Sequence, residues 1–209
     1  MRERGMIFNA DMVRAVLNGS KTQTRRLIDW RRTTRATEIA ERDDGSNWPW
    51  SEDCENGGDY WHACPFGAVG DRLWVRETFG FEIRSVGGAP HEQLVYRASK
   101  PDAVRLYDCN GKPHPMKWTP SLHMRRKYSR ITLEITGVRV ERLRDMTERD
   151  AIAEGCLGGH DSIPGYMYSA TPHEHFHHVW ESIYGEESWQ ANPWVWVIEF
   201  KRVEGGSHD

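Results

Sequence analysis

The segment from Ser129 to Leu143 most constrains how this 209-residue chain can fold. Its apolar residues alternate with polar ones, and the alternation changes phase at Gly137. The apolar positions are Ile131, Leu133 and Ile135 and, out of phase, Val138 and Val140. A two-residue period predicts a strand, and a phase change at a glycine predicts a β-bulge. The chain is therefore predicted to contain one long, bulged strand.

Shorter periodic segments predict the remaining elements. Three further strands are expected at Gly70–Thr78, Gln93–Ala98 and Trp194–Phe200. Three helices are expected, from Asn9 or Asp11 to Gly19, from Thr147 to Gly155 and from Pro172 to Gly185. Thr147 and Asp150 have the spacing of a capping box. Because the helices do not alternate regularly with the strands, the expected class is α+β, around a small mixed barrel or sheet.

Two long segments lack periodicity. Residues 29–69 are rich in tryptophan and glycine and residues 99–128 in proline, and both are predicted to be irregular insertions. The length fits one domain that carries such insertions, so we expect a single domain over residues 1–209.

The overall charge excludes one class of partner interaction. With 28 Lys and Arg against 31 Asp and Glu, bulk charge alone cannot bind nucleic acid, although a local basic groove could. No apolar run reaches the length of a membrane-spanning helix, and Met1–Asn9 lacks the apolar stretch of a signal peptide. The four cysteines form no paired motif. We therefore expect reduced thiols in a cytoplasmic protein that makes no membrane contact.

The segment Gly19–Arg26, with the sequence GSKTQTRR, is the most suggestive for chemistry. A glycine that ends a helix lets the chain turn sharply, and Lys21 and Thr24 follow it at short spacing. A lysine whose pKa is lowered by burial can act as a base toward a threonine hydroxyl. The alternative is a polar turn with a solvated basic end.

The pattern G-x-K-x-x-T-x-R resembles the signature of the ASCH domains, which have a PUA-like β-barrel fold. Gly19, Lys21, Thr24 and Arg26 occupy its four fixed positions. Further segments resemble the family in the same order, and together they cover about half of the chain. These segments are Gly70–Val75, Ile131–Thr136, Leu143–Glu154 and Val197–Phe200. The resemblance implies a PUA-like mixed barrel with flanking short helices.

Within this family the chain is most similar to the bacterial N4-acetylcytidine amidohydrolases. The resemblance implies that Thr24 is the nucleophile, Lys21 the proton acceptor and Glu154 the proton donor. It also implies a small substrate, an N4-acylated cytosine nucleoside or base, and neither metal nor cofactor. Because pyrimidines stack on aromatic rings, tryptophans are candidates for substrate binding. The candidates for substrate binding are the tryptophans Trp74 and Trp194, together with Arg26 and Glu77. Trp30 and Trp118 are further candidate rings.

Two zinc sites are weighed against this reading. Cys54, His62, Cys64 and Cys109 could bind zinc, but their spacing matches no common structural pattern. His173–His177 matches H-E-x-x-H, but the longer zincin pattern fails beyond it. We expect no metal.

An RNA-binding or RNA-cleaving module is the alternative function. ASCH domains resemble PUA RNA binders, and two basic clusters flank the motif region. They are Arg25, Arg26, Arg31, Arg32 and Arg35, and Arg125, Arg126, Lys127 and Arg130. Such clusters could contact RNA phosphates or form solvated surface. The oligomeric state is left open.

Overall fold

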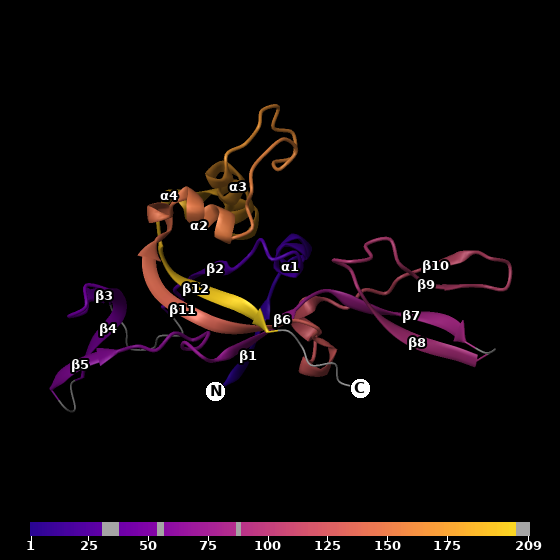
Figure 1. Cartoon of the computed structure of the whole chain (residues 1–209), viewed down its shortest axis with the longest axis horizontal. Coiled ribbons are helices and arrows are strands. Elements are labelled where there is room, and N and C mark those ends of the chain that lie inside the picture. The colour runs from indigo at the N-terminus through magenta and orange to yellow at the C-terminus, as the bar shows by residue number, and fades with distance from the viewer. Residues whose placement is uncertain (31–37, 54–56, 87–88, 204–209) are drawn as a thin grey trace. The chain divides into compact units, whose positions relative to one another are not determined.

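The computed structural model describes residues 1–30, 38–53, 57–86 and 89–203, and it divides into two compact units (Figure 1). The first unit contains Met1–Gly19 and Arg72–Leu133, with Arg202 and Val203 at the end of the last strand. The second unit contains Ser20–Asp71 and Glu134–Lys201. Each unit thus combines segments that are far apart in the sequence.

The first unit is built mainly from hairpins around one helix. Its elements are β1 (Glu3–Ile7), α1 (Ala10–Leu17), β6 (Arg72–Arg76), β7 (Phe79–Val86), β8 (Ala89–Tyr96), β9 (Val104–Tyr107), β10 (Pro113–Pro115) and the 3₁₀ turns η1 (Ser121–His123) and η2 (Arg126–Tyr128). β1 pairs with β6 in parallel, and β7–β8 and β9–β10 are antiparallel pairs. The Asn9 side chain accepts a hydrogen bond from the Met12 amide at 2.8 Å, which confirms the predicted start of α1.

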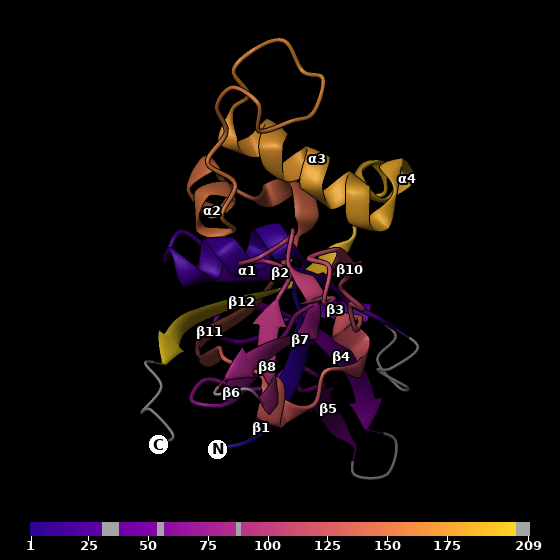
Figure 2. The ribbon, with the colours of Figure 1, turned by 90° about the vertical axis from the view of Figure 1, so that its right-hand side faces the viewer.

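In its described residues, the second unit combines strands with the helices α2, α3 and α4. Its elements are β2 (Gln23–Leu27), β3 (Glu38–Glu41), β4 (Asn47–Asp53), β5 (Gly58–Trp61), η3 (Leu143–Asp145), α2 (Glu148–Ala153), α3 (Pro172–Tyr184) and α4 (Glu186–Gln190), with most of β11 (Thr132–Arg142) and β12 (Trp194–Val203). β12 pairs with β2 in antiparallel fashion, and β3, β4 and β5 form their own sheet. The three helices lie close together, with α3 and α4 in succession (Figure 2).

The long strand predicted from the alternation is confirmed as β11, which begins in the first unit and continues in the second. Leu133 and Ile135 are buried before Gly137 and Val140 after it, so the buried positions change phase as expected. The strand order is β1-β6-β11-β12-β2. Among the described strands β1 and β2 lie at opposite ends of this order, so the class is α+β as predicted but the expected barrel is not closed.

The prediction of an irregular insertion at residues 29–69 is wrong for β3, β4 and β5. Pro49 stands between Trp48 and Trp50 in β4, and a proline within a run normally argues against a strand. The sheet tolerates it because Pro49 lies opposite Ile39 in an antiparallel pair and its carbonyl still accepts from the His62 amide at 2.9 Å. The other insertion, at residues 99–128, also contains strands. They are β9 and β10, which are too short for an alternating pattern to be recognised in the sequence.

An apolar core joins the helices of the second unit to one face of β12. The buried residues of this core are Leu143, Met146, Ala151, Cys156, Phe176, Trp180, Trp189, Val195 and Val197. Leu27 of β2 packs against them. The helices therefore cover the face of β2 and β12 that carries the odd-numbered residues, and α2 lies on this face.

Candidate functional site

The C-terminal end of α2 is hydrogen-bonded to the residues just before β2. Lys21 and Glu154 form an isolated antiparallel bridge, and the Thr22 amide donates to the Ala153 carbonyl at 2.8 Å. On its other side, the Thr22 carbonyl accepts from the Phe200 amide at 2.8 Å. These backbone hydrogen bonds place Lys21 beside Glu154, and the side-chain contacts of the two residues add to them.

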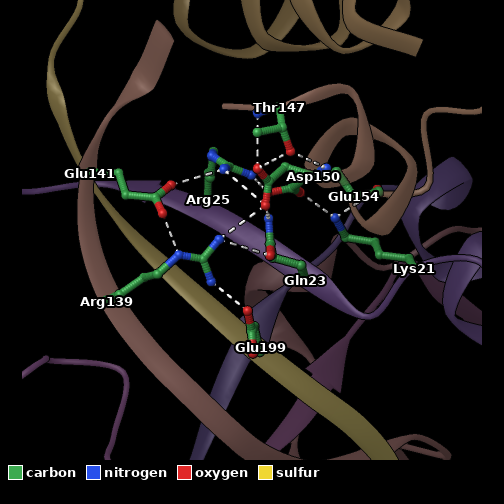
Figure 3. Close-up of polar contacts among 9 residues, drawn as sticks. All are labelled: Lys21, Gln23, Arg25, Arg139, Glu141, Thr147, Asp150, Glu154 and Glu199. Atoms are coloured by element: carbon green, nitrogen blue, oxygen red, sulfur yellow. Dashed lines mark hydrogen bonds and ion pairs between the residues drawn. The ribbon is translucent and has the colours of Figure 1, made fainter. Parts of the chain in front are cut away.

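Lys21 and Glu154 form a buried ion pair (Figure 3). The Lys21 Nζ lies 2.6 Å from Glu154 Oε2, and it also donates to the Glu154 carbonyl at 2.9 Å. Their side chains are 0% and 4% exposed. Burial lowers the pKa of Lys21 from its ordinary value, and the attraction of Glu154 offsets only part of this effect.

Arg25 is the second cation on Glu154. Its guanidinium lies 3.4 Å from Glu154 Oε1, 3.1 Å from Glu141 Oε2 and 3.5 Å from Asp150 Oδ1, and its side chain is 0% exposed. Each buried charge in this group faces an opposite charge, as it must to offset the cost of leaving water.

Arg139 of β11 extends the same network. It forms ion pairs with Glu141 and Glu199, and its guanidinium lies 3.0 Å from Asp150 Oδ1. Gln23 bridges Asp150 and Arg139. Its amide nitrogen donates to Asp150 at 3.2 Å, and its oxygen accepts from Arg139 at 3.3 Å. Figure 3 shows these side chains meeting between β2, β11, β12 and α2.

Asp150 couples this network to the start of α2. One carboxylate oxygen accepts from the Thr147 hydroxyl and amide, at 2.6 and 2.9 Å, and the Thr147 hydroxyl accepts from the Asp150 amide. The predicted capping box is thus confirmed. Burial alone would raise the pKa of Asp150, but these hydrogen bonds, together with Gln23 and Arg25, hold it below its ordinary value.

Cys156 lies close to the pair but belongs to the apolar core. It is 5% exposed, and burial raises the pKa of its thiol to about 12, although Lys21 acts in the opposite direction. Because the thiolate is the reactive form, this cysteine is not set up as a nucleophile.

Thr24 and Arg26 lie on the opposite face of β2. Side chains alternate along a strand, and Gln23 and Arg25 point toward α2. Thr24 is paired with Ile198 in β12, and it is 1% exposed. The structure therefore brings Lys21 and Glu154 together, whereas Thr24 faces the other side of the sheet.

The predicted substrate-binding residues have intramolecular neighbours. Arg26 is paired with Trp196 in the sheet, and Trp194 lies under the guanidinium of Arg142, 4.3 Å from the ring centre. The remaining two candidates belong to the first unit. Trp74 is 5.4 Å from the Arg76 guanidinium, and Glu77 binds Arg130 through both oxygens at 2.8 and 2.9 Å.

The H-E-x-x-H residues serve to start and pack α3. The Glu174 side chain accepts from the Thr171 amide at 2.7 Å, which closes a second capping box. His177 stacks on Trp189 with ring centres 4.2 Å apart, and His173 meets the same indole edge-on at 5.5 Å. The two histidines thus contact one indole.

The cysteine-based zinc site falls partly outside the described residues, since Cys54 does. Cys64 is buried and Cys109 is exposed. In the part of the chain that the structure describes, no group of three or more His, Cys, Asp or Glu could hold a metal ion.

The basic clusters are largely engaged within the chain. Arg25 is enclosed by carboxylates, Arg126 pairs with Glu3, and Arg130 pairs with Glu77. Arg31, Arg32 and Arg35 lie outside the described residues. These clusters therefore offer fewer cations to a phosphate backbone than the sequence indicates.

Sequence reasoning missed most of the network around the pair. Gln23 and Arg25 follow Lys21 at two-residue spacing, so strand alternation could have placed all three on one face. The carboxylates of Glu141 and Asp150 come from a strand and a helix whose meeting no local pattern shows. Only the paired backbone brings them to Arg25.

Comparison with known proteins gives little beyond this geometry. No protein-family model matches the sequence, and no curated protein does. A crystal structure of an ASCH domain from Lactobacillus crispatus JV V101 is similar, with 13% identity and a TM-score of 0.40, over 96% of this chain and 79% of that chain. At this level of similarity we draw no function from it. No helix in the described ranges is long and apolar enough to cross a membrane.

Proposed function

We propose that the chain is a metal-independent amidohydrolase that cleaves N4-acylated cytosines or cytidines, with Lys21 and Glu154 as its proton-transfer pair. The observation that carries the proposal is the buried contact of 2.6 Å between Lys21 Nζ and Glu154 Oε2, in which the Lys21 pKa is lowered. Buried groups with perturbed pKa values are typical of catalytic sites, although structural ion pairs also produce them. The substrate class comes from the family resemblance.

The pair can supply a base and an acid together. A proton shift along the Lys21–Glu154 hydrogen bond converts the ammonium and carboxylate into an amine and a carboxylic acid, with no change in net charge. Burial favours this neutral form. The amine then accepts the proton of the attacking hydroxyl, and the carboxylic acid protonates N4 as the C–N bond breaks. With water consumed, N4-acetylcytidine gives cytidine and acetate.

The nucleophile is the point at which resemblance and geometry differ. The resemblance assigns the attack to Thr24, whereas strand alternation directs Thr24 away from Lys21. Attack by water is the alternative that does not require Thr24 beside Lys21. Thr24→Val separates the two: it abolishes hydrolysis if Thr24 attacks, and it leaves the rate within about tenfold if water does.

The test is incubation of the purified protein with N4-acetylcytidine and chromatographic detection of cytidine. Lys21→Met should lower kcat/KM by about 10²-fold or more, because it removes the base. The matched control is Lys201→Met, which removes the lysine of an exposed pair with Glu134 at 2.9 Å in the same unit. Absence of cytidine with the unmodified protein would refute the proposed substrate.

The RNA alternative has weaker support at the clusters that the sequence singles out. Their described arginines are largely occupied by Glu154, Glu3 and Glu77. A polyanion that used these arginines would compete with their ion pairs.

A further inference from the structure

The small net charge of the chain conceals a strong division between its two units. The first unit has 16 Lys and Arg against 9 Asp and Glu, a net charge of +7. The second has 12 against 22, a net charge of −10. Bulk charge therefore disfavours nucleic acid for the chain as a whole but not for the first unit.

Two hollows adjoin each other on the first unit. One, of about 670 Å³, lies between β7, the turn after β8 and β9, and the other, of about 460 Å³, lies beside the start of α1. Pro101 lines both. β9 contacts β7, and these two strands, with the turn that follows β8, line the larger hollow.

Exposed cations line both hollows. Arg97 lines the smaller hollow, and Lys100 and Arg105 line the larger one. Within the described ranges, the side chains of Arg97 and Arg105 have no ion-pair or hydrogen-bond partner. Lys100 lies 3.6 Å from Glu82, which also binds Arg84 at 2.8 Å. Arg97 and Arg105 are thus accessible to an anionic partner without loss of an ion pair, and Lys100 shares its carboxylate with Arg84.

An exposed aromatic ring accompanies these cations. Tyr107 is 66% exposed, and it follows Arg105 by two residues on the exposed face of β9. Residues at this spacing in a strand lie about 7 Å apart on one side. A cation and an open ring at this distance can contact a phosphate and a neighbouring base together.

We propose that Arg97, Lys100, Arg105 and Tyr107 form a binding surface for single-stranded nucleic acid. The positive charge selects a polyanion, and the open ring selects unpaired bases, because a duplex does not present its base faces. This surface belongs to the β7–β9 region, not to the Arg125–Arg130 cluster, and it does not depend on hydrolysis at Lys21.

The experiment measures fluorescence anisotropy of a labelled single-stranded RNA of about 12 uridines at several salt concentrations. The full chain should bind, and the logarithm of the affinity should fall with the logarithm of salt with a slope of about −2. The triple variant R97E/K100E/R105E should weaken binding at least tenfold and flatten this slope. Tyr107→Ala should weaken binding about fivefold or more with the slope unchanged.

The matched control reverses three exposed cations of the second unit, as R144E/R149E/K201E. It changes the net charge by the same amount, and it should leave binding within about twofold. Equal losses in both triple variants, or no effect of Tyr107→Ala, would overturn the surface in favour of unspecific charge. Salt-sensitive self-association without RNA, abolished by the first triple variant, would instead assign the surface to the acidic unit of a second copy. Melting curves of all variants verify that they fold.

Discussion

At the scale of single residues, the proposed chemistry depends on Glu154, the carboxylate that the buried Lys21 shares with Arg25. Glu154 accepts from Lys21 through one oxygen and lies 3.4 Å from Arg25 through the other. Glu154 is thus the carboxylate that two buried cations share. Burial lowers the pKa of Lys21, so its amine form is easier to reach than for a lysine in water.

The activity should depend on pH as a bell. The pair is competent only while it holds one proton, so activity falls when both groups are protonated and when both are deprotonated. Because the Lys21 pKa is lowered, the alkaline fall should come below the ordinary lysine value of 10.5. Measurement of kcat/KM against pH tests this. A profile that keeps rising through pH 10.5 would contradict a lowered pKa.

Lys21→Arg should retain the ion pair and lose the chemistry. Arginine keeps the positive charge beside Glu154 but does not release its proton in this range. We expect a melting temperature near that of the unmodified protein and a kcat/KM about 10²-fold lower. An active Lys21→Arg variant would mean that position 21 supplies charge, not a base.

The residue-level prediction from sequence was good where the backbone repeats a simple period and poor elsewhere. Lys21 and Glu154 were selected together through the family resemblance, and the structure places them in contact. Thr24 was expected in the same cavity, yet a spacing of three residues in an extended chain alternates faces. The role of Arg25 depends on carboxylates from β11 and α2, which no local pattern could reveal.

At the scale of elements, α2 is the short helix that carries Glu154 at its end. It has only six residues, too few to be stable alone, so its capping box and its bridge to Lys21 must hold it. α3 begins with an equivalent capping box formed by Thr171 and Glu174.

This equivalence allows a matched test. Thr147→Ala and Thr171→Ala should each lower the free energy of unfolding by about 0.5–2 kcal/mol, because each leaves an amide of the first turn without its partner. Only Thr147→Ala should also lower kcat/KM, since α2 positions Glu154. Urea denaturation and steady-state kinetics measure the two effects. Equal activity in both variants would show that α2 does not position the pair.

The elements that could be predicted are those with a long period or a clear cap. β11, α3 and β12 have such signals, and they were found within a few residues. β1 and β7 were missed, as were the strands of the β3–β5 sheet. β1, β3 and β5 are short and carry few apolar residues, so pairing and not periodicity defines them.

At the scale of the whole molecule, burial of Lys21 should make stability depend on pH. Between the lowered pKa in the folded state and 10.5 in the unfolded state, the unfolded chain binds more protons. The free energy of unfolding should therefore rise with pH across this window, by about 1.4 kcal/mol for each unit of lowering. Urea unfolding of the protein and of Lys21→Met at several alkaline pH values should show this rise only in the former. Parallel curves would contradict the lowered pKa.

Hydrolysis should persist in a chelator. The proposed steps use only Lys21, Glu154 and a hydroxyl nucleophile, so EDTA should leave kcat/KM within about twofold. Loss of activity in EDTA with recovery on added zinc would replace the proposal with a metal-dependent reaction.

The most direct test of the central claim is the release of cytidine from N4-acetylcytidine by the protein and by two glutamate variants. Glu154→Gln removes the proposed acid, and Glu134→Gln neutralises the glutamate of the exposed pair with Lys201 in the same unit. The account predicts cytidine release by the unmodified protein and by Glu134→Gln, and a rate lower by about 10²-fold or more for a folded Glu154→Gln. Release by Glu154→Gln at the unmodified rate would contradict it.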